Sequence, residues 1–128
     1  MKKIFFLAAA IILSATGFKS VAQSNSNQPA TIRIKTSVQC TMCRKRITDY
    51  FRREPGVLRV DVNYYNKIVT VRYIPSEIPP SYILNDIANL GYDADTVKAN
   101  PDFYKKLPVC CQQGGGMEMM RKMGIRDY

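Results

Sequence analysis

The chain has 128 residues, of which 46% are hydrophobic and 23% charged, and its formal net charge is +9. It contains no histidine, which removes the commonest general base and the commonest imidazole ligand, so ordinary hydrolase chemistry is not expected. The length predicts one domain with a modest core, and we expect a binding protein rather than an enzyme.

Residues 1–22 have the pattern of a secretory signal peptide. A basic start precedes an apolar stretch over residues 4–13, and Ser20 and Ala22 suit the positions three and one before a cleavage site. The alternative is an uncleaved membrane anchor, but the apolar stretch is short for a bilayer span. We therefore expect a periplasmic or extracellular protein that begins at Gln23, carries a net charge of +6 and has no stable membrane insertion.

The first strand and the first helix are predicted on either side of a cysteine pair. Residues 23–30 are polar and aperiodic, which indicates a flexible lead-in. Apolar and polar residues then alternate from Thr31 onward, as in a half-buried strand. After the cysteines, Ile47, Tyr50 and Phe51 form an apolar stripe at helical spacing. Pro55 and the glycine after it end this helix.

The pattern over residues 57–97 completes a recognisable order of elements. Two alternating segments flank the polar residues Asn66 and Lys67 and predict a hairpin. An amphipathic helix follows between Ser81 and Gly91, and residues 92–97 are interpreted as a last strand. The order predicts an α+β fold, a ferredoxin-like βαββαβ sandwich over residues 31–97.

Residues 98–128 differ in character from the predicted sandwich. They contain two prolines, three consecutive glycines and four methionines, and they have no strand period. We predict one helical turn over residues 102–106, with Phe103 or Leu107 docked on the domain, and beyond it a flexible tail containing cysteine and methionine.

Cys40 and Cys43 are the candidate metal ligands. Cys40 is predicted in the loop before the helix and Cys43 in its first turn, where amide donors, the helix dipole and three basic residues should lower both thiol pKa values. Two thiolates with a two-residue spacer suit Cu(I), with Hg(II) and Ag(I) as chemical relatives, whereas Zn(II) prefers four ligands.

Two other interpretations of this pair remain open. A Cys-x-x-Cys motif at a helix start is also the arrangement of thiol-disulfide redox proteins. The chain, however, has no tryptophan beside the motif, and the domain is short for a thioredoxin-like core. The third interpretation is a structural disulfide, which would stabilise the fold little because it closes so short a loop.

A second set of sulfur donors lies in the tail. Cys110 and Cys111 are adjacent and cannot form an unstrained disulfide with each other, which indicates metal binding or bonds to distant partners. Two geometries are open: the tail folds back to complete a four-thiolate site that admits Zn(II), or it forms a separate Cu(I) site. The candidate thioethers of the tail are Met117, Met119, Met120 and Met123.

Four segments resemble the heavy-metal-associated domain family, which includes copper chaperones and periplasmic mercury-binding proteins. They are CTMC at residues 40–43, EPGV at 54–57, KIVTVRY at 67–73 and LGYDA at 90–94. The resemblance covers residues 31–97. It implies a ferredoxin-like fold, binding of a soft metal ion by Cys40 and Cys43, and transfer of the ion to a partner by ligand exchange.

The sequence departs from the family pattern before the first cysteine. The family usually has Gly-Met there, whereas this chain has Ser37 and Val38. Since the family methionine is described as a packing residue, the resemblance implies that Val38 takes its place. Tyr92 falls where the family often has an aromatic residue near the site.

A set of basic residues is predicted to make one face of the domain positive. Such a face would steer the protein to an acidic membrane transporter domain or another metal-binding protein, or it would only confer solubility. No nucleic acid is expected, because the aromatic signature of RNA-recognition motifs is missing and the chain is predicted to be exported. The residues are Arg44, Lys45, Arg46, Arg52, Arg53, Arg59 and Arg72.

Overall fold

A three-stranded sheet and two longer helices make up the domain in the computed structural model, which describes residues 27–126. The predicted signal peptide therefore lies outside the described residues. The longest helix in this range has 11 residues, and none there is long and apolar enough to cross a bilayer. The domain elements are β1 (Ala30–Lys35), α1 (Thr41–Phe51), β2 (Val57–Asn63), β3 (Ile68–Tyr73) and α2 (Pro80–Asn89).

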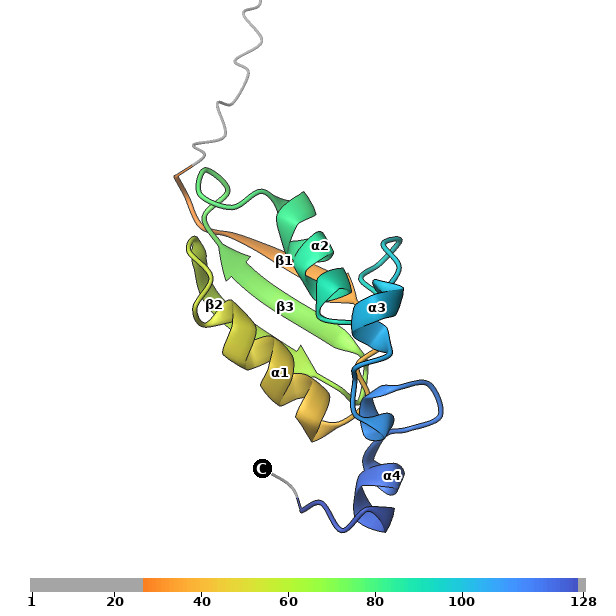
Figure 1. Ribbon diagram of the computed structural model, residues 1–128. Coiled ribbons are helices and arrows are strands. Elements are labelled where there is room, and N and C mark those ends of the chain that lie inside the picture. Colours follow the sequence, from red (N-terminus) through yellow and green to blue (C-terminus); the bar gives the residue numbers. More distant parts are fainter. Residues whose placement is uncertain (1–26, 127–128) are drawn as a thin grey trace, which may run out of the picture.

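The sheet is antiparallel with the strand order β1-β3-β2, and both α1 and α2 lie on the same face of it (Figure 1). In the register, Val69 of β3 stands between Ile34 of β1 and Val62 of β2. All three are buried, because alternate residues of a strand share a face and this face is covered by the helices. Each helix adds an apolar stripe to the core, as the sequence periodicity predicts.

The predicted fourth strand over residues 92–97 is wrong in its extent, because the structure contains only isolated bridges there. Ala94 pairs with Thr36 and with Val97. Asp95 adopts a positive φ of 51°, and its carboxylate accepts a hydrogen bond of 2.8 Å from the Lys35 amide. The chain turns back at this point instead of continuing beside β1. The α+β arrangement of the other predicted elements is confirmed.

A glycine-terminated cap at the end of α2 directs the chain into the site. Gly91 has a φ of 100°, and the amides of Gly91 and Tyr92 donate to the carbonyls of Ala88 and Ile87 at 3.0 and 3.2 Å. This is the Schellman arrangement, which satisfies the last carbonyls of a helix. A side chain at position 91 would meet Leu107 at 3.0 Å, so the glycine also makes room for the following segment.

The tail is not the flexible segment that the sequence predicted. It continues as α3 (Pro101–Tyr104), the 3₁₀ helix η1 (Val109–Cys111) and α4 (Met117–Lys122), which gather at the end of the domain where α1 begins (Figure 1). Of the two predicted docking residues, Leu107 is buried and Phe103 is 44% exposed. The segment packs through a few separated side chains, so it shows no periodicity in the sequence.

Candidate metal site

Cys40 caps α1 with its own sulfur. The residue has extended backbone angles, and its Sγ accepts a hydrogen bond from the Cys43 amide at 3.4 Å. Serine or aspartate oxygen usually fills this position, where a side chain satisfies a free amide at the helix start. The Sγ atoms of Cys40 and Cys43 lie 3.0 Å apart. The predicted positions of the two cysteines, before the helix and in its first turn, are confirmed.

The tail brings its two cysteines to the same place. The Sγ atoms of Cys40 and Cys111 are 3.5 Å apart, and those of Cys40, Cys110 and Cys111 all lie within 4.8 Å of one another. All four cysteines of the chain fall in the described range, and all are buried free thiols. This arrangement corresponds to the first of the two predicted geometries, in which the tail folds back on the domain pair.

One methionine contacts this cluster, and another contacts the start of α1 beside it. The Met120 Sδ, which is fully buried, accepts a hydrogen bond of 3.4 Å from the Thr41 hydroxyl at the start of α1. The Met42 Sδ lies 3.5 Å from the Cys110 Sγ. Sequence reasoning missed Met42, although a thioether between the two motif cysteines was a visible signal. Of the other predicted thioethers, Met117 and Met119 are partly buried against the core, and Met123 is 45% exposed.

The glycine run after Cys111 forms a tight turn rather than a linker. A Cβ at Gly115 would stand 2.4 Å from the carbonyl oxygen of Val109, so only glycine fits without displacing the backbone. The Gly116 amide donates to the Cys110 carbonyl at 2.7 Å. From the other side, the Gln39 amide group donates to the carbonyls of Cys110 and Gln112. The loop before α1 and the tail are thus held together around Cys110.

The thiols differ strongly in acidity. Hydrogen bonds from Cys111 and then Cys40 lower the pKa of Cys43 to about 3. For Cys40, the hydrogen bond with Cys111 favours the thiolate, but the hydrogen bond to Cys43 and burial outweigh it and raise the pKa to about 12. Hydrogen bonding to Cys40 and Cys43 also raises the pKa of Cys111. The prediction that both motif thiols are acidified is therefore wrong for Cys40, and Cys43 is the motif thiol that carries the negative charge.

Tyr92 lies beside the cluster, as the family resemblance implies. The residue is fully buried, and its hydroxyl makes no hydrogen bond within the described residues. Burial raises the pKa of Tyr92, and the negative charge of Cys43 raises it further. The ring therefore stays neutral and presents an apolar wall and one polar atom to the sulfur atoms.

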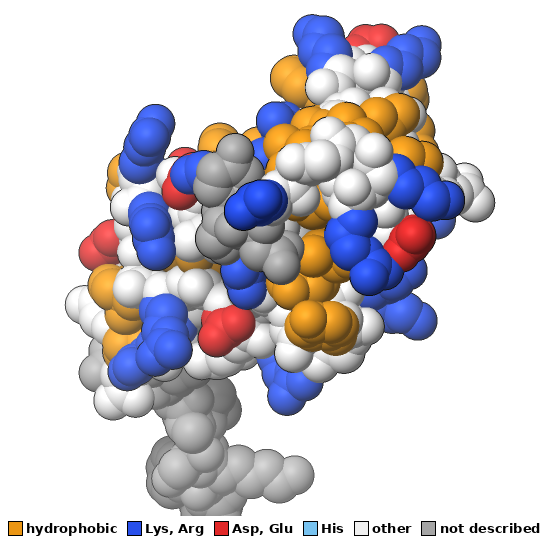
Figure 2. Space-filling model, turned by 90° about the horizontal axis from the view of Figure 1, so that it is seen from below, with side chains coloured by type: hydrophobic (Ala, Val, Ile, Leu, Met, Phe, Trp, Pro, Cys, Tyr) orange, Lys and Arg blue, Asp and Glu red, His pale blue; other side chains and the backbone are white. Residues whose placement is uncertain are grey.

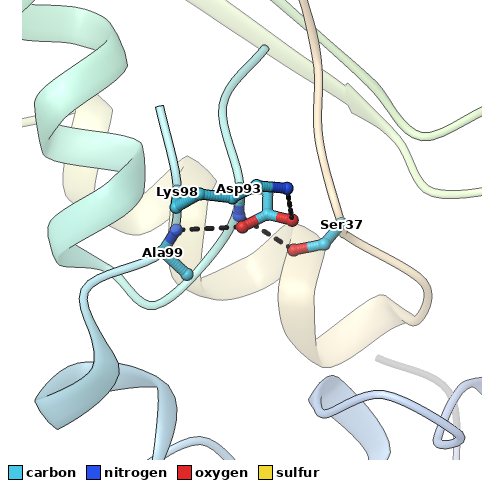
Figure 3. A network of polar contacts seen from close by, with 4 residues as sticks. All are labelled: Ser37, Asp93, Lys98 and Ala99. Carbon is cyan, nitrogen blue, oxygen red and sulfur yellow. Dashed lines mark hydrogen bonds and ion pairs between the residues drawn. The ribbon is translucent and has the colours of Figure 1, made fainter. Parts of the chain in front are cut away.

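Ser37 and Val38, which replace the Gly-Met of the family pattern, have different structural roles. Val38 is fully buried in the core, in keeping with the packing role that the resemblance implies. The Ser37 hydroxyl accepts a hydrogen bond of 3.0 Å from the Asp93 amide (Figure 3). The Asp93 carboxylate in turn accepts from the Ala99 amide at 2.9 Å and pairs with Lys98 at 3.5 Å. This network joins the loop before the cysteines to the start of the tail.

A cleft of about 530 Å³ runs beside the site. Of the four cysteines, only Cys111 lines it, and the lysines Lys67 and Lys98 stand on its walls together with Tyr104. Cys111 itself is only 2% exposed. The cleft therefore reaches the edge of the sulfur cluster without opening it to solvent.

On the face that carries α4, the basic side chains do not form a single patch. Lys45 pairs with Asp49 at 2.8 Å, and the Arg44 guanidinium lies 5.3 Å from the centre of the Tyr64 ring. Figure 2 shows Lys and Arg side chains scattered over the end of the molecule that carries α4, with Asp and Glu among them. The electrostatic character of this end is positive but diffuse.

Comparison with known proteins finds a family match for the domain. Residues 33–93 match the family model described as the heavy-metal-associated domain. A copper-exporting P-type ATPase of Staphylococcus haemolyticus is 31% identical over 67 residues, which make up 52% of this chain and 8% of the ATPase. The chain thus spans a small part of that curated relative.

Two solved structures agree with this match. The water-soluble region of the P-type ATPase CopA from Bacillus subtilis is 30% identical with a TM-score of 0.50, over 53% of this chain and 46% of that one. A putative copper-ion-binding protein from Bacillus anthracis has a TM-score of 0.51 at 23% identity, over 54% and 99% of the two chains, which shows the fold alone. Over residues 33–93, this chain is therefore similar in sequence and fold to the heavy-metal-associated domain family.

Proposed function

We propose that this protein binds a soft metal ion through Cys40 and Cys43 and acts as a carrier or scavenger outside the cytoplasm. The observation that carries the proposal is the pair of free thiols 3.0 Å apart at the start of α1. Two sulfur donors at this spacing favour Cu(I), with Ag(I), Hg(II) and Zn(II) as further candidates. The copper-related names of the relatives support Cu(I) as the first choice.

Binding and transfer follow from the acidity of the two thiols. The low pKa of Cys43, about 3, supplies one thiolate before any ion arrives, whereas Cys40 must release its proton when the ion binds. The free amides and the positive dipole end at the start of α1 stabilise the negative charge of the pair. A thiolate of the partner then replaces one cysteine at a time, which moves the ion without any redox change.

The place of action and the partner are part of the same proposal. The signal-peptide pattern of residues 1–22 supports a periplasmic or extracellular protein. The exposed basic residues Arg44, Lys45 and Arg46 support docking to an acidic surface, on a membrane transporter domain or another metal-binding protein. Amino-terminal sequencing of the exported protein should find Gln23 first, and an intact amino terminus in the cytoplasmic fraction would contradict export.

Metal retention tests the binding itself. The chain from Gln23, purified reduced and without oxygen, should hold Cu(I) after desalting, and the Cys40→Ser/Cys43→Ser variant should lose at least ~100-fold in affinity. The Met123→Leu variant is the matched control, because Met123 is the most exposed of the candidate sulfur ligands. Equal retention by the double variant would defeat the proposal.

Thiol-disulfide exchange is the second candidate function. The observation in its favour is the low pKa of Cys43, about 3, beside a second thiol 3.0 Å away, since a stable thiolate is the attacking group of redox proteins. A redox protein would reduce insulin disulfides repeatedly in the presence of dithiothreitol and a chelator. Reduction no faster than with dithiothreitol alone would leave the metal carrier as the function.

A further inference from the structure

We propose that residues 108–123 form a cap that supplies two more ligands, Cys110 and Cys111, so that one chain encloses its ion in a four-thiol site. The inference rests on the proposed function and deepens it, because it changes the class of ion that the site accepts. Two thiols suit a monovalent soft ion, whereas four thiolates suit a divalent thiophilic ion such as Zn(II) or Cd(II). The cap thus gives this domain a divalent substrate as well.

The sulfur atoms of Cys40, Cys110 and Cys111 lie close enough together to hold such an ion. Zinc–sulfur bonds of about 2.3 Å in a tetrahedron place neighbouring sulfur atoms about 3.8 Å apart. The separations here lie on either side of that value: 3.0 Å between Cys40 and Cys43, 3.5 Å between Cys40 and Cys111, and at most 4.8 Å among Cys40, Cys110 and Cys111. Cys43 lies close to Cys40 but outside the group of three, so its sulfur must move for all four to bind one ion.

The cap is built to hold this position. The Gln39 side chain binds the carbonyls of Cys110 and Gln112, and Gly115 permits a turn in which a Cβ would meet the Val109 carbonyl at 2.4 Å. Met120 of α4 is fully buried and accepts a hydrogen bond from Thr41, next to the first cysteine. The Gln39 and Met120 contacts join the tail to the loop and helix that carry the motif, so they orient the tail cysteines toward it.

Closure has a consequence for transfer. The four thiols are at most 2% exposed, so a partner cannot reach an ion held among them while the cap is in place. Ion binding releases thiol protons to solvent, and transfer requires Cys110 and Cys111 to leave the ion while the partner's thiolates take their places. Cys110 and Cys111 lie on η1 (Val109–Cys111), so η1 is the element that must move away from the start of α1.

Cadmium is the probe for the number of sulfur ligands. The reduced chain from Gln23 should bind one Cd(II) with a thiolate-to-cadmium absorbance about twice that of the Cys110→Ser/Cys111→Ser variant, since this band scales with the number of Cd–S bonds. Intact-mass analysis after alkylation should find four protected thiols in the loaded wild type and two in the variant. The Met123→Leu control should match the wild type in both measurements.

A second variant keeps every sulfur atom and disturbs only the cap. Gly115→Ala should weaken Cd(II) binding at least ~10-fold and speed the release of Cu(I) to a chelator, because the added methyl group displaces the turn that carries Cys110. Far-ultraviolet circular dichroism should show the domain still folded in both variants.

The outcomes separate the cap from the proposed function. A wild type that holds Cu(I) but protects only two thiols with Cd(II), or that matches both variants, overturns the cap and leaves the carrier intact. A wild type that holds neither ion overturns the carrier itself. Four protected thiols that fall to two in the serine variant, with faster Cu(I) release from Gly115→Ala, establish the cap.

Discussion

At the scale of single residues, the site consists of cysteine thiols that have the same intrinsic acidity but different pKa values in the folded protein. Cys43 receives hydrogen bonds from two other thiols and becomes the thiolate, while Cys40 and Cys111 keep their protons. A helix start and nearby basic residues predict acidification of the whole pair from sequence, because they act on both cysteines. Hydrogen bonding between the sulfur atoms decides which one carries the charge.

The acidity of Cys43 predicts a pH dependence of stability in the metal-free protein. The folded pKa of about 3 lies below the unfolded value of about 8.5, so ionised Cys43 contributes stability that is full above the unfolded pKa and is lost as the pH falls toward 3. Cys40, with its pKa raised to about 12, stays protonated in both states across this window. The stability advantage of the wild type over Cys43→Ser should therefore shrink between pH 8 and pH 5.

Urea unfolding at the two pH values, with a chelator and a reductant present, measures this difference. The Met123→Leu variant is the comparison, because this exposed side chain does not titrate and the variant keeps all four thiols, so it should add no such slope. A wild-type advantage over Cys43→Ser that is the same at pH 8 and pH 5 would show that Cys43 is not the thiolate.

Tyr92 carries a second prediction at this scale. Its buried hydroxyl has no hydrogen-bond partner among the described residues, and such a group costs about 1–3 kcal/mol. Tyr92→Phe should therefore raise the free energy of unfolding of the metal-free protein by about 1 kcal/mol, as measured by urea unfolding. A loss of stability would mean that the hydroxyl donates to one of the neighbouring thiols.

At the scale of elements, the junction between α2 and the tail organises the site. Gly91 ends α2 and leaves space for the Leu107 side chain. Tyr92, which lies beside the sulfur cluster, follows directly after this glycine. The predicted last strand is absent because Asp95 turns the chain and binds the edge of β1 with its carboxylate. An aspartate in an alternating segment is compatible with a strand or a turn. Here the hydrogen bond from the Lys35 amide to the Asp95 carboxylate favours the turn.

This junction predicts a large effect at Leu107 and a small one at Phe103. Leu107 is 4% exposed, and removal of a buried leucine side chain costs about 2–5 kcal/mol. Leu107→Ala should lower the free energy of unfolding by an amount of this order and make the tail more sensitive to protease. Phe103→Ala, at a side chain that is 44% exposed, is the control and should change stability by less than ~1 kcal/mol. Equal effects in denaturant unfolding would contradict this account of docking.

At the scale of the whole molecule, a small domain is completed by its own carboxyl-terminal segment. The core of the sheet, α1 and α2 is continuous with a sulfur-rich layer that contains Cys110, Cys111 and Met120. The tail therefore adds buried surface as well as potential ligands, and it covers the end of the domain at which the motif lies.

Removal of this segment separates the two contributions. A chain of residues 23–100 retains β1 to β3, α1 and α2 and should unfold cooperatively, with a free energy of unfolding lower by several kcal/mol, on the order of the lost leucine and methionine burial. Cys40 and Cys43 should react with an alkylating reagent at least ~10-fold faster, because the cap that buries them is gone. A truncated chain without cooperative unfolding would show that the tail is part of the folding unit itself.

The sequence by itself determined the elements and the motif. Alternation, helical periodicity and the stops at Pro55 and Gly91 are local signals, and they predicted three strands, two helices and the place of Cys40 and Cys43 correctly. Only the tertiary structure decided the rest: the turn at Asp95, the packed tail, the contact of Met42 with Cys110 and the charge on Cys43. Each of these depends on a few contacts between residues far apart in the chain, and such contacts leave no period in the sequence from which they can be predicted.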